Sequence, residues 1–113
     1  MKLNIKELSN IDDIKTVTEI FNPGTIISGA YTSDLLSDVV ANAKKDNVWI
    51  TLQAHLNITA VASLKEIAAI IIVMNREISK DTLGKAVEEK ITILTTGLTS
   101  FQISGKLYEY GIR

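Results

Sequence analysis

The stretch NVWITLQAHLN, residues 47–57, decides the fold. Its first part, residues 48–52, is apolar, and three hydrogen-bonding side chains follow: Gln53, His55 and Asn57. An apolar run of this length suits a strand that is buried on both faces, as the strands of parallel sheets are. The polar residues stand where this strand gives way to a helix, which is where open α/β sheets bind ligands. The stretch therefore predicts a central strand that ends at a candidate ligand site.

The rest of the chain alternates between strand-like and helix-like patterns. Residues 67–74 form a second continuous apolar run, rich in β-branched side chains, and therefore predict another central strand. The order predicts a compact α/β fold, one domain over residues 1–113, with a mainly parallel sheet flanked by helices. The expected strands are residues 25–32, 48–52, 67–74 and 92–94, with a strand or irregular arm at 14–20; the expected helices lie in residues 2–10, 35–43, 58–66, 80–89 and from 99 to a stop at 111.

Polar residues at expected helix starts predict N-caps. Ser33 and Ser79 precede two helical patterns, and Thr99 with Gln102 three residues later forms a capping-box pattern. Apolar residues at helical spacing predict the buried faces. These faces are expected to include Leu35, Leu36, Val39, Val40 and Ala43 in one helix, Leu83, Ala86 and Val87 in another, and Phe101, Leu107 and Tyr108 in the last.

Composition argues against several classes of function. The chain has 12 Lys and Arg against 13 Asp and Glu and no basic block, so it lacks the charge that drives nucleic-acid binding. It has no cysteine and one histidine, so neither a disulfide framework, a structural metal nor a cofactor is expected. The first residues lack the apolar core of a secretory signal, and the longest hydrophobic region, residues 58–74, is interrupted by Lys65 and Glu66. A cytoplasmic location without a membrane partner is expected.

The candidate site lies at the carboxyl edge of the predicted sheet. Because parallel strands end on one edge, residues that follow different strands converge there, and helix N-termini add amides that favour anions. The sequence contains neither a phosphate-binding glycine loop nor a Gly-x-Ser-x-Gly elbow. The convergence of polar residues and helix amides at this edge instead favours a small anionic metabolite or a nucleotide as the ligand. The residues expected to bind it are Ser33, Asp34, Gln53, His55, Asn57, Asn75 and Thr96.

Other interpretations of these residues stay open. Ser33 and Asn57 have ordinary roles in starting helices, and Arg76 is interpreted as a solvated strand terminator. His55 is a possible general base, oriented by Asp34 if the two meet in space. Trp49 is either a stacking platform for a base or, more simply, a core residue.

Four segments resemble the DRTGG domain family: ISGAYTSDLLSDV at residues 27–39, WITLQ at 49–53, HLNI at 55–58 and AVASL at 60–64. Residues 28–30, Ser-Gly-Ala, stand where Thr-Gly-Gly is usual in that family, and the Asp-Arg pair is replaced. The resemblance implies a fold similar to the N-terminal domain of HPr kinase. Related domains occur in phosphotransacetylases and beside CBS domains in pyrophosphatases, and stand-alone forms occur in anaerobes, some beside iron-only hydrogenase genes.

The resemblance implies a regulatory, ligand-sensing or assembly module that pairs with itself and is without an established catalytic activity of its own. Apolar Ile26, Ile27 and Tyr31, together with the small-residue helix over residues 60–64, also favour a homodimer. Two alternatives remain: a scaffold for a hydrogenase-linked or other metabolic partner, and a small enzyme that uses His55 and Asp34.

Overall fold

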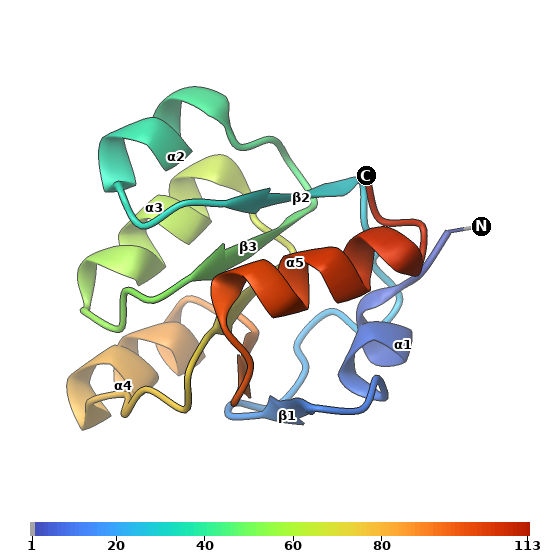
Figure 1. The fold of residues 1–113 in the computed structure, drawn as a ribbon. Coiled ribbons are helices and arrows are strands. Elements are labelled where there is room, and N and C mark those ends of the chain that lie inside the picture. Colours follow the sequence, from blue (N-terminus) through green and yellow to red (C-terminus); the bar gives the residue numbers. More distant parts are fainter. Residues whose placement is uncertain (1) are drawn as a thin grey trace.

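A five-stranded sheet lies between two layers of helices in the computed structural model, which describes residues 2–113 (Figure 1). The strand order is β1-β5-β4-β3-β2; β2 to β5 run parallel, and β1 pairs antiparallel with β5. The predicted α/β fold with a mainly parallel sheet is confirmed. The elements are α1 (Ile5–Ser9), β1 (Ile14–Thr16), β2 (Gly29–Thr32), α2 (Leu36–Asn42), β3 (Asn47–Thr51), α3 (Asn57–Lys65), β4 (Ala69–Ile72), α4 (Lys80–Glu88), β5 (Ile93–Thr96) and α5 (Ser100–Glu109).

Strands β3 and β4 form the buried centre of the sheet. Every residue of both strands is buried, and the two pair in register from Val48 opposite Ala69 to Thr51 opposite Ile72. The central position predicted for both apolar runs is therefore confirmed. Trp49 has no exposed surface, and its indole Nε1 donates to the Ser33 carbonyl oxygen at 2.9 Å. Trp49 is accordingly a core residue and not a stacking platform.

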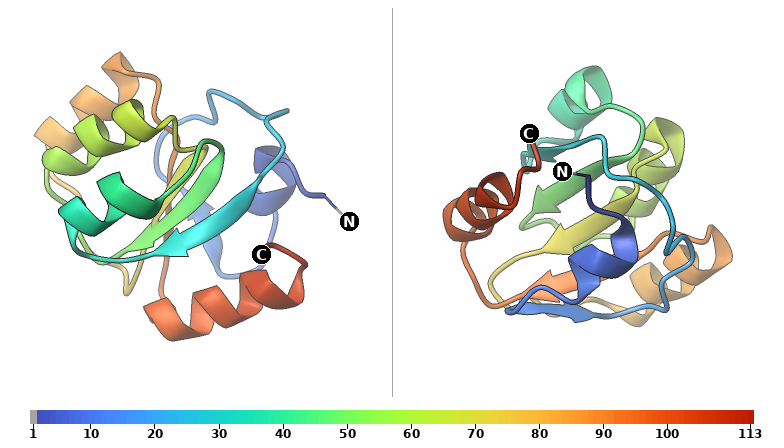
Figure 2. Two further views of the ribbon diagram at one scale, coloured as in Figure 1. Left: turned by 90° about the horizontal axis from the view of Figure 1, so that it is seen from above. Right: turned by 90° about the vertical axis from the view of Figure 1, so that its right-hand side faces the viewer.

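Two separate cores lie on the two faces of the sheet because successive strand side chains point to opposite sides. Helices α2, α3 and α4 cover the face that carries Trp49 and Ile70, whereas α1 and α5 cover the face that carries Ile50 and Ile71 (Figure 2). No helix within residues 2–113 is long and apolar enough to cross a lipid bilayer.

The helix caps follow the sequence at two starts and differ at a third. Ser79 accepts from the Thr82 amide, and the capping box of α5 between Thr99 and Gln102 is formed, as predicted. The prediction of Ser33 as an N-cap is wrong, because α2 begins at Leu36 with Leu35 at its N-cap position. The carboxylate of Asp34 binds the end of β3, which keeps the chain extended for longer before the helix starts.

The predicted buried stripe of α5 is confirmed for Leu107 and wrong for Phe101 and Tyr108. Its buried residues are Ile103 and Leu107, which are four residues apart and so lie on one face of the helix. Phe101 is 88% exposed and Tyr108 is 56% exposed, because the two share a different flank of α5 that points outward. The other exposed residues that were expected on inner helix faces are Leu35, Val40 and Val87.

Candidate functional site

Asp34 joins the carboxyl ends of two neighbouring strands, β2 and β3. Its carboxylate oxygen Oδ1 accepts from the Thr51 hydroxyl at 2.9 Å and from the Leu52 amide at 2.7 Å. The Gln53 side-chain amide in turn donates to the Asp34 carbonyl oxygen at 3.0 Å. These bonds fix Asp34 and Gln53 relative to each other, while the second carboxylate oxygen of Asp34 has no hydrogen bond from residues 2–113.

A surface depression of about 300 Å³ opens beside this pair of residues. Asp34, Leu52, Gln53, His55 and Arg76 line it. These residues follow β2, β3 and β4, so three strand ends contribute to one hollow. In the described part of the chain, the side chains of His55 and Arg76 form neither hydrogen bonds nor ion pairs. Both are exposed and therefore accessible to a ligand.

A second depression, of about 360 Å³, adjoins the first and shares His55 and Arg76 with it. Its other polar lining residues are Glu77, Ser79 and Asp81, at the start of α4. Arg76 therefore lies between two hollows at the carboxyl edge. We call the two hollows together the carboxyl-edge site.

The charges of the carboxyl-edge site are mixed. Arg76 is its one cation among the described lining residues, and Asp34, Glu77 and Asp81 are carboxylates. A guanidinium group pairs with a planar or tetrahedral oxyanion through two parallel hydrogen bonds, and a carboxylate accepts from hydroxyl or amino groups. The site therefore suits a ligand that carries one anionic group together with hydroxyl or amino groups.

The loop after β4 holds Arg76 in place through a strained backbone. Met74 and Asn75 both adopt left-handed conformations, with φ of 60° and 51°. Such a conformation costs a non-glycine residue about 1 kcal/mol or more, so other interactions must impose it. Here the Met74 amide donates to the Leu98 carbonyl oxygen at 3.0 Å, and the Asn75 amide donates to the Thr96 carbonyl oxygen at 2.9 Å. The loop after β5 thus fixes the loop that carries Arg76.

Of the seven predicted site residues, Asp34, Gln53 and His55 line the carboxyl-edge site. The other four are Ser33, Asn57, Asn75 and Thr96, and they line neither hollow. Ser33 accepts from the Leu35 amide, and Thr96 is buried and accepts from the Leu98 amide, so both hydroxyls serve turns. Asn57 is exposed at the start of α3. Asn75 packs beside Gly97: a Cβ atom added to Gly97 would lie 3.0 Å from Nδ2 of Asn75.

Arg76 is the lining residue that the sequence interpretation set aside as a solvated strand terminator. Its position, after the end of β4 as His55 follows the end of β3, already places it at this edge by the topology, but the sequence interpretation left it out of the expected ligand set. Ligand binding by all of these residues stays a prediction.

The arrangement expected of a histidine base is not formed at the site. His55 and Asp34 line the same hollow, but no hydrogen bond joins them, and Asp34 Oδ1 is already shared by Thr51 and Leu52. A general base is normally held by a third group that fixes the orientation of its ring.

Within residues 2–113, no group of three or more His, Asp and Glu side chains could hold a metal ion.

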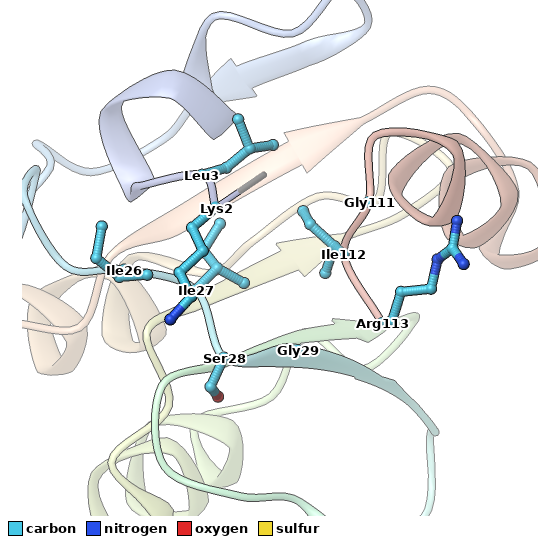
Figure 3. Close-up of a pocket in the computed structure, with 9 residues that line it drawn as sticks. All are labelled: Lys2, Leu3, Ile26, Ile27, Ser28, Gly29, Gly111, Ile112 and Arg113. Carbon is cyan, nitrogen blue, oxygen red and sulfur yellow. The ribbon is translucent and has the colours of Figure 1, made fainter.

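A larger depression, of about 420 Å³, lies at the opposite end of the sheet, near the start of β2 (Figure 3). Its polar side chains are largely engaged elsewhere. The Ser28 hydroxyl donates to the Lys45 carbonyl oxygen at 2.6 Å and accepts from Asn47. The Arg113 guanidinium stacks on the ring of Tyr108, 4.1 Å from its centre. The carboxyl-edge site therefore offers more unengaged polar groups, and we take it as the candidate functional site.

No protein-family model matches the chain, and no curated protein matches it. Among solved structures, the chain is similar to the CBS and DRTGG domains of the regulatory region of Clostridium perfringens pyrophosphatase, crystallised with the activator diadenosine tetraphosphate. The TM-score is 0.67 at 17% sequence identity, over 80% of this chain and 40% of that chain. The chain thus spans less than half of that structure's length, and this identity establishes the fold alone. The chain has the α/β fold of a DRTGG-like domain.

Proposed function

We propose that the chain is a non-catalytic regulatory module that binds a small anionic metabolite or nucleotide at the carboxyl-edge site and acts as a homodimer. The observation that carries the proposal is the meeting of Asp34, Gln53, His55 and Arg76, from three strand ends, around one hollow. Two of these side chains are open to a ligand, and the others are held in position by hydrogen bonds. The site is therefore preformed on one side and accessible on the other.

The mixed charges of the site favour a nucleoside monophosphate over more highly charged nucleotides. Arg76 would bind the phosphate, while Asp34 Oδ2 would accept from the sugar hydroxyls. Glu77 and Asp81 beside Arg76 would repel additional phosphates. The similar pyrophosphatase structure contains a nucleotide activator, which supports the nucleotide class.

The first test is a thermal-shift and calorimetry series with AMP, ADP, ATP and diadenosine tetraphosphate. A ligand that binds only the folded state raises its stability by about 2.7 kcal/mol at a concentration of 100 times Kd. We expect AMP to raise Tm most. If millimolar concentrations of all four compounds leave Tm unchanged, the nucleotide proposal is wrong.

Arg76→Gln tests the site itself. It should weaken AMP binding at least tenfold and leave the Tm of the free protein nearly unchanged, because the Arg76 side chain is exposed and makes no bond within residues 2–113. Lys80→Gln is the matched control, since Lys80 is an exposed cation four residues away that lines neither hollow. Equal binding by the wild type and Arg76→Gln would exclude this site.

His55→Ala separates the module from the enzyme alternative, in which His55 and Asp34, which line the same hollow without a hydrogen bond between them, would act together. If the chain is a non-catalytic module, the wild type should not turn over the bound compound, and His55→Ala should bind that compound more weakly. Turnover that disappears in His55→Ala would instead establish the enzyme. A pull-down from the source organism addresses the scaffold alternative.

A further inference from the structure

The unengaged polar atoms of the carboxyl-edge site follow an order along its two hollows. In the first hollow, Asp34 Oδ2 accepts no hydrogen bond within residues 2–113, and the Gln53 side-chain amide already donates to the Asp34 carbonyl oxygen. In the second hollow, the carboxylates of Glu77 and Asp81 form neither hydrogen bonds nor ion pairs within the same residues. The side-chain groups still open on these residues are therefore acceptors, since a carboxylate and an amide oxygen only accept.

Among the described lining residues, side-chain donors are open only where the two hollows meet. Arg76 and His55 line both hollows. Ser79 lines the second, but its hydroxyl proton is used: the Thr82 hydroxyl donates to the Ala54 carbonyl oxygen at 3.2 Å, so the Ser79 hydroxyl, 2.9 Å from Thr82, is the donor between the two. The carboxyl-edge site thus has acceptors at both ends and a guanidinium group in the middle.

This order of groups specifies the charge and the shape of a complementary ligand. The ligand carries an anionic group at its centre and hydroxyl or amino donors on both sides. A phosphomonoester has a charge of about −1.5 to −2 at neutral pH, whereas a phosphate that links two groups carries one negative charge. Among the described lining residues, three carboxylates surround one guanidinium, so the singly charged phosphodiester is favoured.

The two hollows suit two ligand groups of similar size. Their volumes are about 300 Å³ and 360 Å³, each near the lower end of the range of about 300–1,000 Å³ for small-molecule sites. Each hollow also has an apolar lining against which a planar ring can pack: Leu52 in the first, and Ala54 and Leu56 in the second. A ring with amino and hydroxyl groups on each side of one phosphate matches this arrangement.

We propose that the ligand is a dinucleoside monophosphate, with its phosphodiester on Arg76 and one nucleoside in each hollow. The ribose hydroxyls and base amino groups donate to Asp34 on one side and to Glu77 and Asp81 on the other. This assignment rests on the proposed function and names the ligand of the same site. A nucleoside monophosphate such as AMP fills one hollow and leaves the carboxylates of the other without donors.

Calorimetric titration of the whole chain with three compounds tests the assignment. The compounds are AMP, the methyl ester of AMP and adenylyl-adenosine, in which one phosphodiester joins two adenosines. The methyl ester has the single charge of adenylyl-adenosine but only one nucleoside, so it separates the effect of charge from that of the second nucleoside. We expect the methyl ester to bind at least as tightly as AMP, and adenylyl-adenosine to bind at least tenfold more tightly than the methyl ester.

Ala54→Leu tests the place of the second nucleoside, because the added atoms fill part of the second hollow. In this variant, adenylyl-adenosine and the methyl ester should bind equally. Leu56→Trp repeats the test at a position that is 47% exposed, in case the half-buried Ala54 does not tolerate the larger side chain. Ala60→Leu is the matched control, since Ala60 is exposed on α3 and lines neither hollow. It should keep the tenfold preference, and circular dichroism identifies any variant that fails to fold.

The outcomes separate the two-nucleoside ligand from the proposed function. If AMP binds and adenylyl-adenosine binds no more tightly than the methyl ester, the two-nucleoside ligand is overturned and the nucleotide module stands. If none of the three compounds binds, both are overturned. A preference for adenylyl-adenosine that persists in folded Ala54→Leu and Leu56→Trp would overturn the second hollow as the place of the second nucleoside.

Discussion

Asp38 connects helix α2 to the edge strand β2. Its carboxylate oxygen Oδ1 accepts from the Tyr31 hydroxyl and from the Asn42 side-chain amide, both at 2.8 Å. The hydroxyl of Ser33, followed by those two donors, holds the pKa of Asp38 below its usual value. The same contact with Asp38 raises the pKa of Tyr31. The ionised form of Asp38 is thus the form that the fold favours.

Asp38→Asn should change how the stability of the fold depends on pH. Because the folded state binds the proton of Asp38 more weakly than the unfolded state, Asp38 stabilises the fold above the ordinary carboxyl pKa of 3.8. This contribution is lost as the pH falls through the lowered pKa. The variant should therefore be less stable than the wild type at pH 7, and the difference should shrink below about pH 4. Urea unfolding at several pH values measures it.

Asp12→Asn serves as the comparison, since Asp12 is exposed and its carboxylate forms no hydrogen bond with the described residues. This change should leave the pH dependence nearly unaltered. A constant stability gap between wild type and Asp38→Asn from pH 7 to pH 2 would show that the carboxylate charge does not matter.

At the scale of the elements, the start of α5 is stabilised by a capping box in which Thr99 is the N-cap residue. The Thr99 hydroxyl accepts from the Gln102 amide at 3.2 Å, and the Gln102 side chain accepts from the Thr99 amide at 3.0 Å. Thr99→Ala should lower the free energy of unfolding by about 1 kcal/mol, because it leaves helix amides without a partner. This corresponds to a decrease in Tm of about 4 °C for a chain of this size.

Thr99→Ser keeps the hydroxyl and should retain most of the stability. Calorimetry at one fixed protein concentration compares the three proteins without interference from association. Equal losses in Thr99→Ala and Thr99→Ser would point to the methyl group and not to the cap.

Elements were predictable from the sequence where burial dictates the residue pattern. β3 and β4 are buried on both faces, so their sequences are continuous apolar runs, and Ser79 and Thr99 sit at real helix starts. The buried face of α5 was not predictable in the same way, because Phe101 is as hydrophobic as Ile103. Hydrophobicity does not distinguish a side chain that packs on the core from one that faces outward. Ser33 failed as a cap because Asp34 bonds to β3, a contact that is distant in sequence.

At the scale of the whole molecule, the topology indicated where a site should lie, but not which side chains form it. Parallel strands bring the residues after β2, β3 and β4 to one edge, and this much follows from the order of the elements. Thr96 follows the same rule but lies buried, because the turn after β5 uses its hydroxyl. Arg76 reaches the site through a left-handed loop, and Met74 gives no sequence signal for that conformation, although asparagine, as at position 75, adopts it more readily than most residues do. Side-chain direction at the edge is thus set by tertiary hydrogen bonds.

The burial of β4 also determines how its backbone exchanges hydrogen with solvent. Ile70, Ile71 and Ile72 have no exposed surface, and strands flank them on both sides. Their amide protons should exchange with deuterium only when the whole chain unfolds, so the slowest rates should report the global free energy of unfolding. AMP at 100 times its Kd should then slow all three about 100-fold, although it binds at the sheet edge and touches none of them. Fast exchange at β4 would mean that the centre of the sheet opens locally, while a slowing limited to the amides around Arg76 would mean that the ligand only shields its own site.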